Sequence, residues 1–252
     1  MKLDLLILSF VQGIAEFLPV SSSGHLLYLD HLLGLRIDRF NSVLWLHLAT
    51  LLAIVVYFYP KIKVLLKDKD YLLKIFTAFF GTVLVALFLR RSVIYIYGVE
   101  SLNILGLLFL INGIILFISG LRKSRDKKLT FKFAVLIGLM QGFSVFPGIS
   151  RSGITIVVAL LLGLTKDEAF KFSFLLAIPT IIGAVAYESL KSSWNSQVFN
   201  GINISWIVYF IVTFIVGLLA LSLLERMVFR KKLPFFGYYC CIIGLIVLFI
   251  GG

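Results

Sequence analysis

The 252-residue chain is poor in cysteine and in charged residues, and it lacks the short motifs of several enzyme classes. Its two cysteines, Cys240 and Cys241, are adjacent. Neighbouring side chains on a helix point to different faces, so neither a disulfide framework nor a cysteine metal site is indicated. No HExxH, CxxC or Walker sequence occurs, which leaves a dedicated zinc site and an ATP-driven machine without support.

Hydrophobic residues make up 60% of the chain, the mean hydropathy is +1.06, and apolar runs of nearly 20 residues recur along the whole length. This composition is typical of a polytopic helical membrane protein. The net charge of +12 does not indicate a nucleic-acid partner, because the basic residues cluster between apolar runs, as in cytoplasmic loops. We expect the N-terminal apolar run to remain in the mature protein, because no small-residue cleavage site follows it.

Six apolar runs predict membrane crossings: 41–59, 71–89, 102–120, about 169–190, 204–224 and 233–251. Two further regions, 3–34 and 129–165, are interrupted near their middles by LPVSSSG and PGISRSG. Their apolar halves, on the order of 12 residues each, are too short to cross a bilayer and predict re-entrant helix-loop-helix hairpins.

The distribution of basic residues predicts the topology. Loops 60–70, 121–132 and 225–232 hold fourteen Lys or Arg residues, whereas loops 28–40, 90–101 and 191–203 hold five. If the first set is cytoplasmic, the crossings alternate only when each hairpin returns to the side from which it enters. The first hairpin then enters from outside, the second enters from the cytoplasm, and both termini lie outside.

An internal repeat accounts for this arrangement. Shifting the chain by 129 residues superposes QGIAEFLPVSSSG on QGFSVFPGISRSG with six identities in thirteen positions. We therefore expect one membrane domain, 1–252, made of repeats of approximately 1–120 and 129–251. The expected fold is an all-α polytopic membrane protein in which six transmembrane helices and two re-entrant hairpins form an inverted-topology repeat. Such repeats place polar sites near the midplane, with helix N-termini directed at an anion.

Ionisable residues inside apolar segments are functional candidates, because an unpaired charge in a bilayer is costly. Glu16 follows Gln12 by one helical turn, on the same face. His25 follows Ser22 by three residues and Ser21 by four, a spacing suited to a nucleophile and its base. The serines could equally cap a helix while His25 bonds a carbonyl. His47, alone in an apolar run, is more typical of a packing residue.

Arg151 is the strongest candidate for binding an anion. Its guanidinium stays charged and offers a planar set of donors that suits phosphate or carboxylate. Glycines, hydroxyl groups and the start of a predicted half-helix surround it, and together they form a cradle for one anion. A salt bridge between Arg151 and Glu16 is the alternative, and it is compatible with function.

The two motifs, QGIAEFLPVSSSGH at 12–25 and PGISRSGIT at 147–155, closely resemble those of the undecaprenyl-diphosphate phosphatase family, membrane phosphatases linked to bacitracin resistance. The resemblance extends over nearly the whole chain. It implies hydrolysis of undecaprenyl diphosphate to undecaprenyl phosphate and inorganic phosphate, which recycles the lipid carrier for cell-wall synthesis. A transporter or flippase of a phosphorylated polyprenyl lipid is the alternative function.

The resemblance also implies roles for individual residues. The implied catalytic residues are Glu16, Ser22, His25 and Arg151, and the candidate substrate-binding residues are Gln12, Ser21, Ser23, Gly148, Ser150, Ser152 and Thr155. A divalent cation, Mg2+ or Ca2+, is the implied cofactor, with Glu16 as its candidate ligand. Many members carry Glu at the position of Gln12, so this chain has one carboxylate fewer for a metal.

The implied partners are the polyprenyl diphosphate substrate and membrane lipid, without nucleic acid; the sequence leaves a homodimer open. The implied location is the bacterial inner membrane, with the site facing the extracytoplasmic side. The sequence does not decide whether Ser22, His25 or water is the nucleophile.

Overall fold

The computed structural model describes residues 3–34, 39–99, 102–121, 126–191 and 204–251, which are almost entirely helical. These ranges contain no β-strand, only one isolated bridge between Lys127 and Leu164. The α-helices are α1 (Leu3–Ala15), α2 (Ser22–Leu33), α3 (Arg39–Tyr57), α4 (Tyr59–Leu65), α5 (Lys69–Val99), α6 (Leu102–Ile118), α7 (Phe131–Gly142), α8 (Arg151–Leu161), α9 (Lys166–Lys191), α10 (Ile204–Phe229) and α11 (Leu233–Gly251).

Four of the described helices, α5, α9, α10 and α11, are long and apolar enough to cross a membrane. The pair α3 and α4 adds a fifth candidate span, which bends by 73° at its break. Six crossings were predicted; α6, with 17 residues, lies at the lower end of the length range that spans a bilayer, so the sixth crossing stays a prediction. Large apolar side chains point outward from these helices; Phe88 is 84% exposed and Phe249 is 89% exposed. The chain is therefore a multi-pass membrane protein by helix length and surface composition.

Several helices extend beyond the predicted boundaries. Helix α5 runs to Val99, so Arg90 and Arg91 lie on a helix where a loop was predicted from residue 90. Helix α10 similarly continues to Phe229, past the predicted end at 224. The apolar pattern marks only the lipid-facing length, whereas the backbone hydrogen bonds of a helix continue into its polar end.

Both predicted helix breaks are present, and local chemistry explains them. After α1 the chain contains Pro19 and then Ser21, whose φ of 69° is unusual for a residue other than glycine. The Ser21 hydroxyl accepts a hydrogen bond from the Gly24 N–H and caps α2. In the second break, Gly148 has a φ of 102°, which a side chain would disfavour, and Ser150 caps α8 in the same way as Ser21 caps α2.

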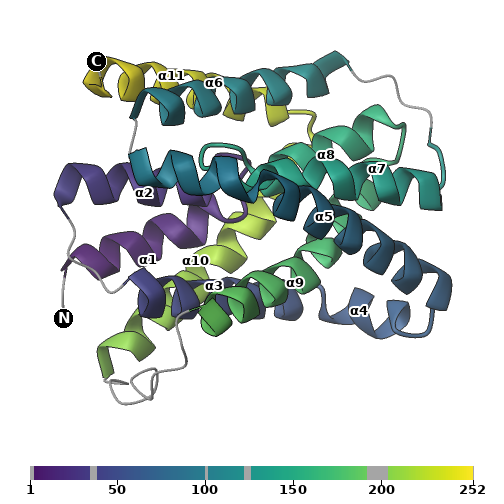
Figure 1. Ribbon diagram of the computed structural model, residues 1–252. Coiled ribbons are helices and arrows are strands. Elements are labelled where there is room, and N and C mark those ends of the chain that lie inside the picture. The colour runs from purple at the N-terminus through teal and green to yellow at the C-terminus, as the bar shows by residue number, and fades with distance from the viewer. Residues whose placement is uncertain (1–2, 35–38, 100–101, 122–125, 192–203, 252) are drawn as a thin grey trace.

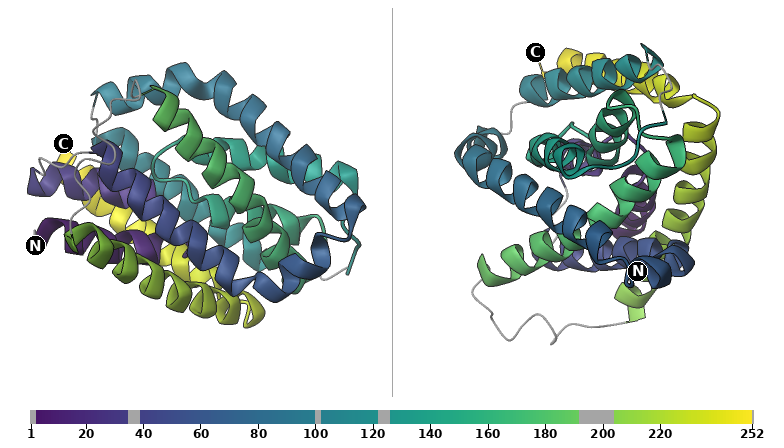
Figure 2. Two further views of the ribbon diagram at one scale, coloured as in Figure 1. Left: turned by 90° about the horizontal axis from the view of Figure 1, so that it is seen from below. Right: turned by 90° about the vertical axis from the view of Figure 1, so that its right-hand side faces the viewer.

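The two broken helix pairs meet in the middle of the molecule (Figure 1). We call α1–α2 the first hairpin and α7–α8 the second hairpin. Helix α1 packs on α10 and α7 packs on α5, while α6 packs on α11 and α3 on α9. Figure 2 shows α6 and α11 running side by side along one edge of the bundle. The breaks of both hairpins are thus enclosed by the longer helices.

A cluster of buried aromatic rings lies directly beside the first break. Phe17 is fully buried, and its ring centroid lies 5.9 Å from that of Phe174 on α9. Phe58 and Phe170 extend the cluster toward α3 and α9. Because Phe17 follows Glu16 in the chain, this packing fixes the end of α1 and with it the carboxylate.

Close packing of α5 against α7 depends on Gly138. A Cβ atom at this position would lie 2.1 Å from the Ala78 carbonyl oxygen, so the two backbones touch. At Gly183 on α9, by contrast, a Cβ would meet ring atoms of Phe79 at 3.4 Å, an ordinary contact.

We therefore predict that Gly138→Ala lowers stability by about 1–3 kcal/mol, because overpacking separates α5 from α7. Gly183→Ala is the matched control and should be neutral or stabilising by up to ~1 kcal/mol, because alanine favours a helix. Thermal unfolding of the detergent-solubilised protein measures both effects. Equal melting temperatures for the two variants would contradict the prediction.

Candidate functional site

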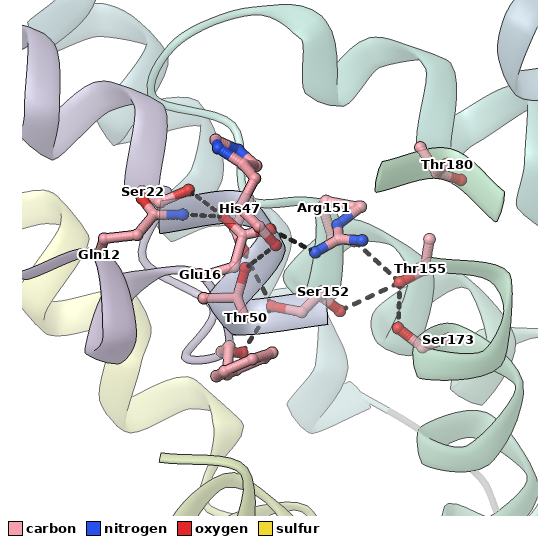
Figure 3. Close-up of polar contacts among 12 residues, drawn as sticks. Gln12, Glu16, Ser22, His47, Thr50, Arg151, Ser152, Thr155, Ser173 and Thr180 are labelled. Atoms are coloured by element: carbon pink, nitrogen blue, oxygen red, sulfur yellow. Dashed lines mark hydrogen bonds and ion pairs between the residues drawn. The ribbon is translucent and has the colours of Figure 1, made fainter. Parts of the chain in front are cut away.

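A buried ion pair joins the two hairpins. Arg151, the first residue of α8, donates from Nη2 to Oε1 of Glu16 at the end of α1, with an N···O distance of 2.5 Å. The Arg151 side chain is 13% exposed and that of Glu16 is 7% exposed. The pairing that the sequence offered as an alternative reading of Arg151 is therefore present (Figure 3).

The second oxygen of the Glu16 carboxylate accepts two further hydrogen bonds. The Ser22 hydroxyl, at the start of α2, donates to Oε2 over 2.6 Å, and the amide of Gln12 donates to the same atom over 3.1 Å. Charge-assisted hydrogen bonds of this kind are stronger than neutral ones. Glu16 is thus the point at which the hydroxyl and the guanidinium meet.

His47 of α3 also lies beside this pair (Figure 3). Thr50, one turn further along α3, donates to the His47 carbonyl over 3.0 Å. The sequence reading favoured a packing role for His47. His47 was nevertheless among the ionisable residues of apolar segments that the sequence marked as functional candidates.

His25 has partners other than Ser22. Its Nδ1 lies 2.8 Å from the Ser21 carbonyl, and its Nε2 lies 2.7 Å from the Tyr239 hydroxyl on α11. A carbonyl can only accept, so Nδ1 carries the proton and Nε2 accepts from Tyr239 when the ring is neutral. The His25 ring also stacks on Tyr239, with an interplanar angle of 9°, and meets the edge of Phe109.

The hydroxyl groups around Arg151 link the hairpins and cap α8. The Ser21 hydroxyl accepts from the Gly148 N–H over 3.0 Å, and the Ser152 hydroxyl donates to the Phe17 carbonyl over 2.8 Å. Thr155 bonds the Arg151 carbonyl and lies 2.6 Å from the Ser173 hydroxyl. Ser150 Oγ lies 3.1 Å from Ser152 Oγ, and Ser23 Oγ lies 3.4 Å from Ser21 Oγ. Most of the predicted site residues therefore lie where the hairpins meet, whereas the His25 ring packs against Tyr239 of α11 and Phe109 of α6.

Two polar atoms at this centre are buried without a hydrogen-bond partner: Arg151 Nη1, a donor, and Gln12 Oε1, an acceptor. Native proteins rarely leave such groups unsatisfied, and the exceptions mark ligand positions or ordered water. The unsatisfied guanidinium nitrogen is suited to an anion. Arg151 also stands at the N-terminus of α8, where the helix dipole favours negative charge.

Glu16 and the Gln12 carbonyl oxygen are the oxygen atoms of the site that could hold a cation. No cluster of three His, Cys, Asp or Glu side chains with metal-binding geometry occurs in the part of the chain that the structure describes. Mg2+ is commonly held by one or two carboxylates together with phosphate oxygens of the substrate. Glu16 and Gln12 Oε1 could contribute to such a site, but by themselves they do not form a complete protein cage.

Besides His47 and Ser173, two further residues outside both motifs contact the site. Tyr239 reaches His25 from α11, and Asn112 reaches both helix breaks from α6. Neither position carries a spacing signal in the sequence. Both contacts arise from the packing of helices that are distant in the sequence.

The fold and the site define an all-helical, multi-pass membrane protein with a buried polar centre at the junction of two broken hairpins. The family model of bacitracin resistance protein BacA matches residues 5–246, and the chain belongs to this family. It is 36% identical to an undecaprenyl-diphosphatase of Thermosipho africanus over 98% of this chain and 99% of the relative. It is 38% identical to an undecaprenyl-diphosphatase of Methanococcus vannielii over 97% of this chain and 98% of the relative.

The hydrogen bond from Tyr239 to His25 leads to a spectroscopic prediction. Tyr239→Phe keeps the stacked ring but removes the donor to Nε2, so we expect a changed ring 15N signal for His25. The chain has three histidines, which makes selective 15N-histidine labelling practical. Tyr238→Phe is the matched control, because the Tyr238 ring packs on Phe117 instead. An unchanged His25 signal in Tyr239→Phe would mean that the hydrogen bond is absent.

Proposed function

We propose that the chain is a membrane phosphatase that hydrolyses undecaprenyl diphosphate to undecaprenyl phosphate and inorganic phosphate. Membership of the BacA family and the printed names of the relatives support this activity. The observation that carries the proposal is the Ser22 hydroxyl on the Glu16 carboxylate, beside an arginine with an unsatisfied donor. A nucleophile, a proton acceptor and an anion-binding group are thereby combined.

In the proposed mechanism, Arg151 and the N-terminus of α8 bind the terminal phosphate. Ser22 Oγ attacks the terminal phosphorus; an O–P bond forms, and the bond to the bridging oxygen breaks. Undecaprenyl phosphate leaves, the hydroxyl proton passes to Glu16, and water then hydrolyses the phosphoserine. The sequence also offered His25 as base or nucleophile. The 2.6 Å bond from Ser22 favours Glu16 as the proton acceptor, because both His25 nitrogens have other partners.

A divalent cation, Mg2+ or Ca2+, is proposed as the cofactor, with Glu16 and the unpartnered Gln12 Oε1 as its protein ligands. When bound it would neutralise negative charge on the diphosphate. Gln12 donates its amide hydrogen to Glu16, so it also holds the carboxylate in place.

The transport alternative requires an anion site that opens alternately to the two sides of the membrane. It does not require a serine hydroxyl bonded to a carboxylate beside that anion. The phosphatase reading therefore accounts for more of the site than transport does.

The membrane arrangement is also a proposal. We propose that both hairpins are re-entrant, that the helices form an inverted repeat, and that the site opens to the extracytoplasmic side. In the proposed repeat, α1 corresponds to α7 and α5 corresponds to α10. The packing of α1 on α10 and of α7 on α5 supports the repeat, because each contact joins a helix of one half to the equivalent partner in the other half. The 14-to-5 excess of basic residues in three alternate loops supports the orientation.

Phosphate release by the purified protein tests the function. With undecaprenyl diphosphate and Mg2+ in detergent, we expect the wild type to release inorganic phosphate and Glu16→Gln to be about 10²–10⁴-fold slower. Ser22→Ala should lose comparable activity, whereas the neighbouring Ser23→Ala should keep most of it, because the Ser23 hydroxyl lies beside Ser21. A wild-type protein that binds the lipid without releasing phosphate would instead support transport, and equal losses for the two serine variants would remove Ser22 from its role.

Cysteine labelling tests the orientation. In a background with Cys240→Ala and Cys241→Ala, we expect a membrane-impermeant thiol reagent to label Arg36→Cys and Ser196→Cys from outside intact cells. Leu65→Cys and Ser124→Cys should react only after the membrane is opened. The reverse pattern would place the termini and the first hairpin on the cytoplasmic side.

A further inference from the structure

Asn112 is a polar residue in the middle of the most apolar of the shorter helices. Helix α6 otherwise consists almost entirely of Leu, Ile, Phe and Gly, and Asn112 is fully buried within it. An amide costs free energy when it is buried, unless its donors and its acceptor all find partners. Its position therefore requires an explanation that the proposed catalytic residues do not supply.

The Asn112 side chain is fully satisfied by three partners. Its Nδ2 donates to the Pro19 carbonyl over 2.9 Å and to Cys240 Sγ over 3.2 Å. Its Oδ1 accepts from the Ser150 N–H over 2.9 Å. One amide therefore contacts the broken backbone of both hairpins at once.

The two backbone groups adjoin the reacting side chains. Pro19 lies midway between Glu16 and Ser22 in the first break, and Ser150 immediately precedes Arg151 in the second. Both groups are exposed by the helix breaks, where the regular backbone pattern does not satisfy them. Holding them fixes the carboxylate and hydroxyl on one side and the guanidinium on the other.

Helix α6 packs against both breaks close to Asn112. A Cβ on Gly24 would lie 2.7 Å from the Phe109 ring and 2.8 Å from the Gly148 nitrogen. A Cβ on Gly148 would lie 2.8 Å from Leu108. The glycines of the two motifs thus let both breaks approach the same face of α6, one turn before Asn112.

We propose that Asn112 is a positioning residue, which sets the distance between Ser22–Glu16 and Arg151 by clamping the two breaks to α6. This inference rests on the proposed phosphatase activity for its catalytic consequence. Asn112 contacts none of the proposed reacting groups, so its effect on the reaction is transmitted through Pro19 and Ser150.

Steady-state kinetics provide the first test. Asn112→Leu keeps a similar volume but loses every hydrogen bond, and we expect a loss in kcat on the order of 10²-fold, the effect of a misplacement of about 1 Å. KM should change little, because the alignment of Ser22 and Glu16 with Arg151 matters mainly in the transition state. Thr82→Val is the matched control; it removes a buried hydroxyl that joins α5 to α7, and it should lower stability while kcat is retained. A wild-type kcat in folded Asn112→Leu would overturn the proposal, as would an equal loss in Thr82→Val.

The isosteric variant Asn112→Asp provides a sharper test. A protonated carboxyl group can donate to Pro19 and accept from Ser150, whereas a carboxylate can only accept. We expect the ratio of its kcat to that of the wild type to rise as the pH is lowered, while the ratio for Asn112→Leu stays low throughout. The titratable groups on the adjoining elements, Cys240, His25 and the Glu16–Arg151 pair, are present in every protein compared. If the kcat ratios of the two variants to the wild type follow the same pH profile, the proposed role of Asn112 is overturned.

Hydrogen exchange separates this inference from the proposed function. Removing the acceptor from the Ser150 N–H should increase deuterium uptake in peptides that cover 146–153 in Asn112→Leu, without a change in α10. Thr82→Val should leave the 146–153 peptides as in the wild type. If the wild type cleaves no diphosphate, the phosphatase proposal fails. The exchange experiment still tests whether Asn112 holds the backbone at Ser150, because it does not depend on activity. Unchanged uptake at 146–153 would overturn the proposed role of Asn112.

Discussion

The ion pair between Arg151 and Glu16 is the constraint on which the rest of the structure depends. A guanidinium does not lose its charge inside a protein, so its burial requires a carboxylate in close contact and further hydrogen bonds. Removing one partner of such a pair costs about 3–5 kcal/mol, because the other charge is left uncompensated. Since the partners lie 135 residues apart, their pairing requires the two hairpins to meet.

The broken backbones follow from the same requirement. An unbroken helix satisfies its own backbone groups, but it cannot direct a helix N-terminus and free peptide groups at a central site. The breaks allow this, and the exposed groups are then satisfied by Ser21, Ser152 and Asn112. Much of the polarity of the two motifs therefore holds the site together, while Arg151 Nη1 and Gln12 Oε1 stay buried without a hydrogen-bond partner.

The serines of the two motifs make different kinds of contact. The expected phosphate contacts of Ser21, Ser150 and Ser152 stay a prediction; in the structure their hydroxyl groups cap helices or link the hairpins. Ser22 differs from them because its hydroxyl bonds the carboxylate that also holds the arginine. The distinction has a physical origin: neighbouring residues at the start of a helix point in different directions, so one serine reaches Glu16 while its neighbour does not.

The sequence by itself determined that the chain is helical and membrane-embedded, where two helices break, and that Glu16 and Arg151 are charges in apolar surroundings that need partners. Those features follow from local quantities, namely the length of apolar runs, the positions of Pro and Gly, and the cost of charge in lipid. It did not determine the lengths of α5 and α10, the approach of His47, or the contacts of Tyr239 and Asn112. Only the tertiary structure decided these, because they depend on how helices that are distant in the sequence pack together. A single amide on an apolar helix forms no sequence pattern from which its partners could be predicted.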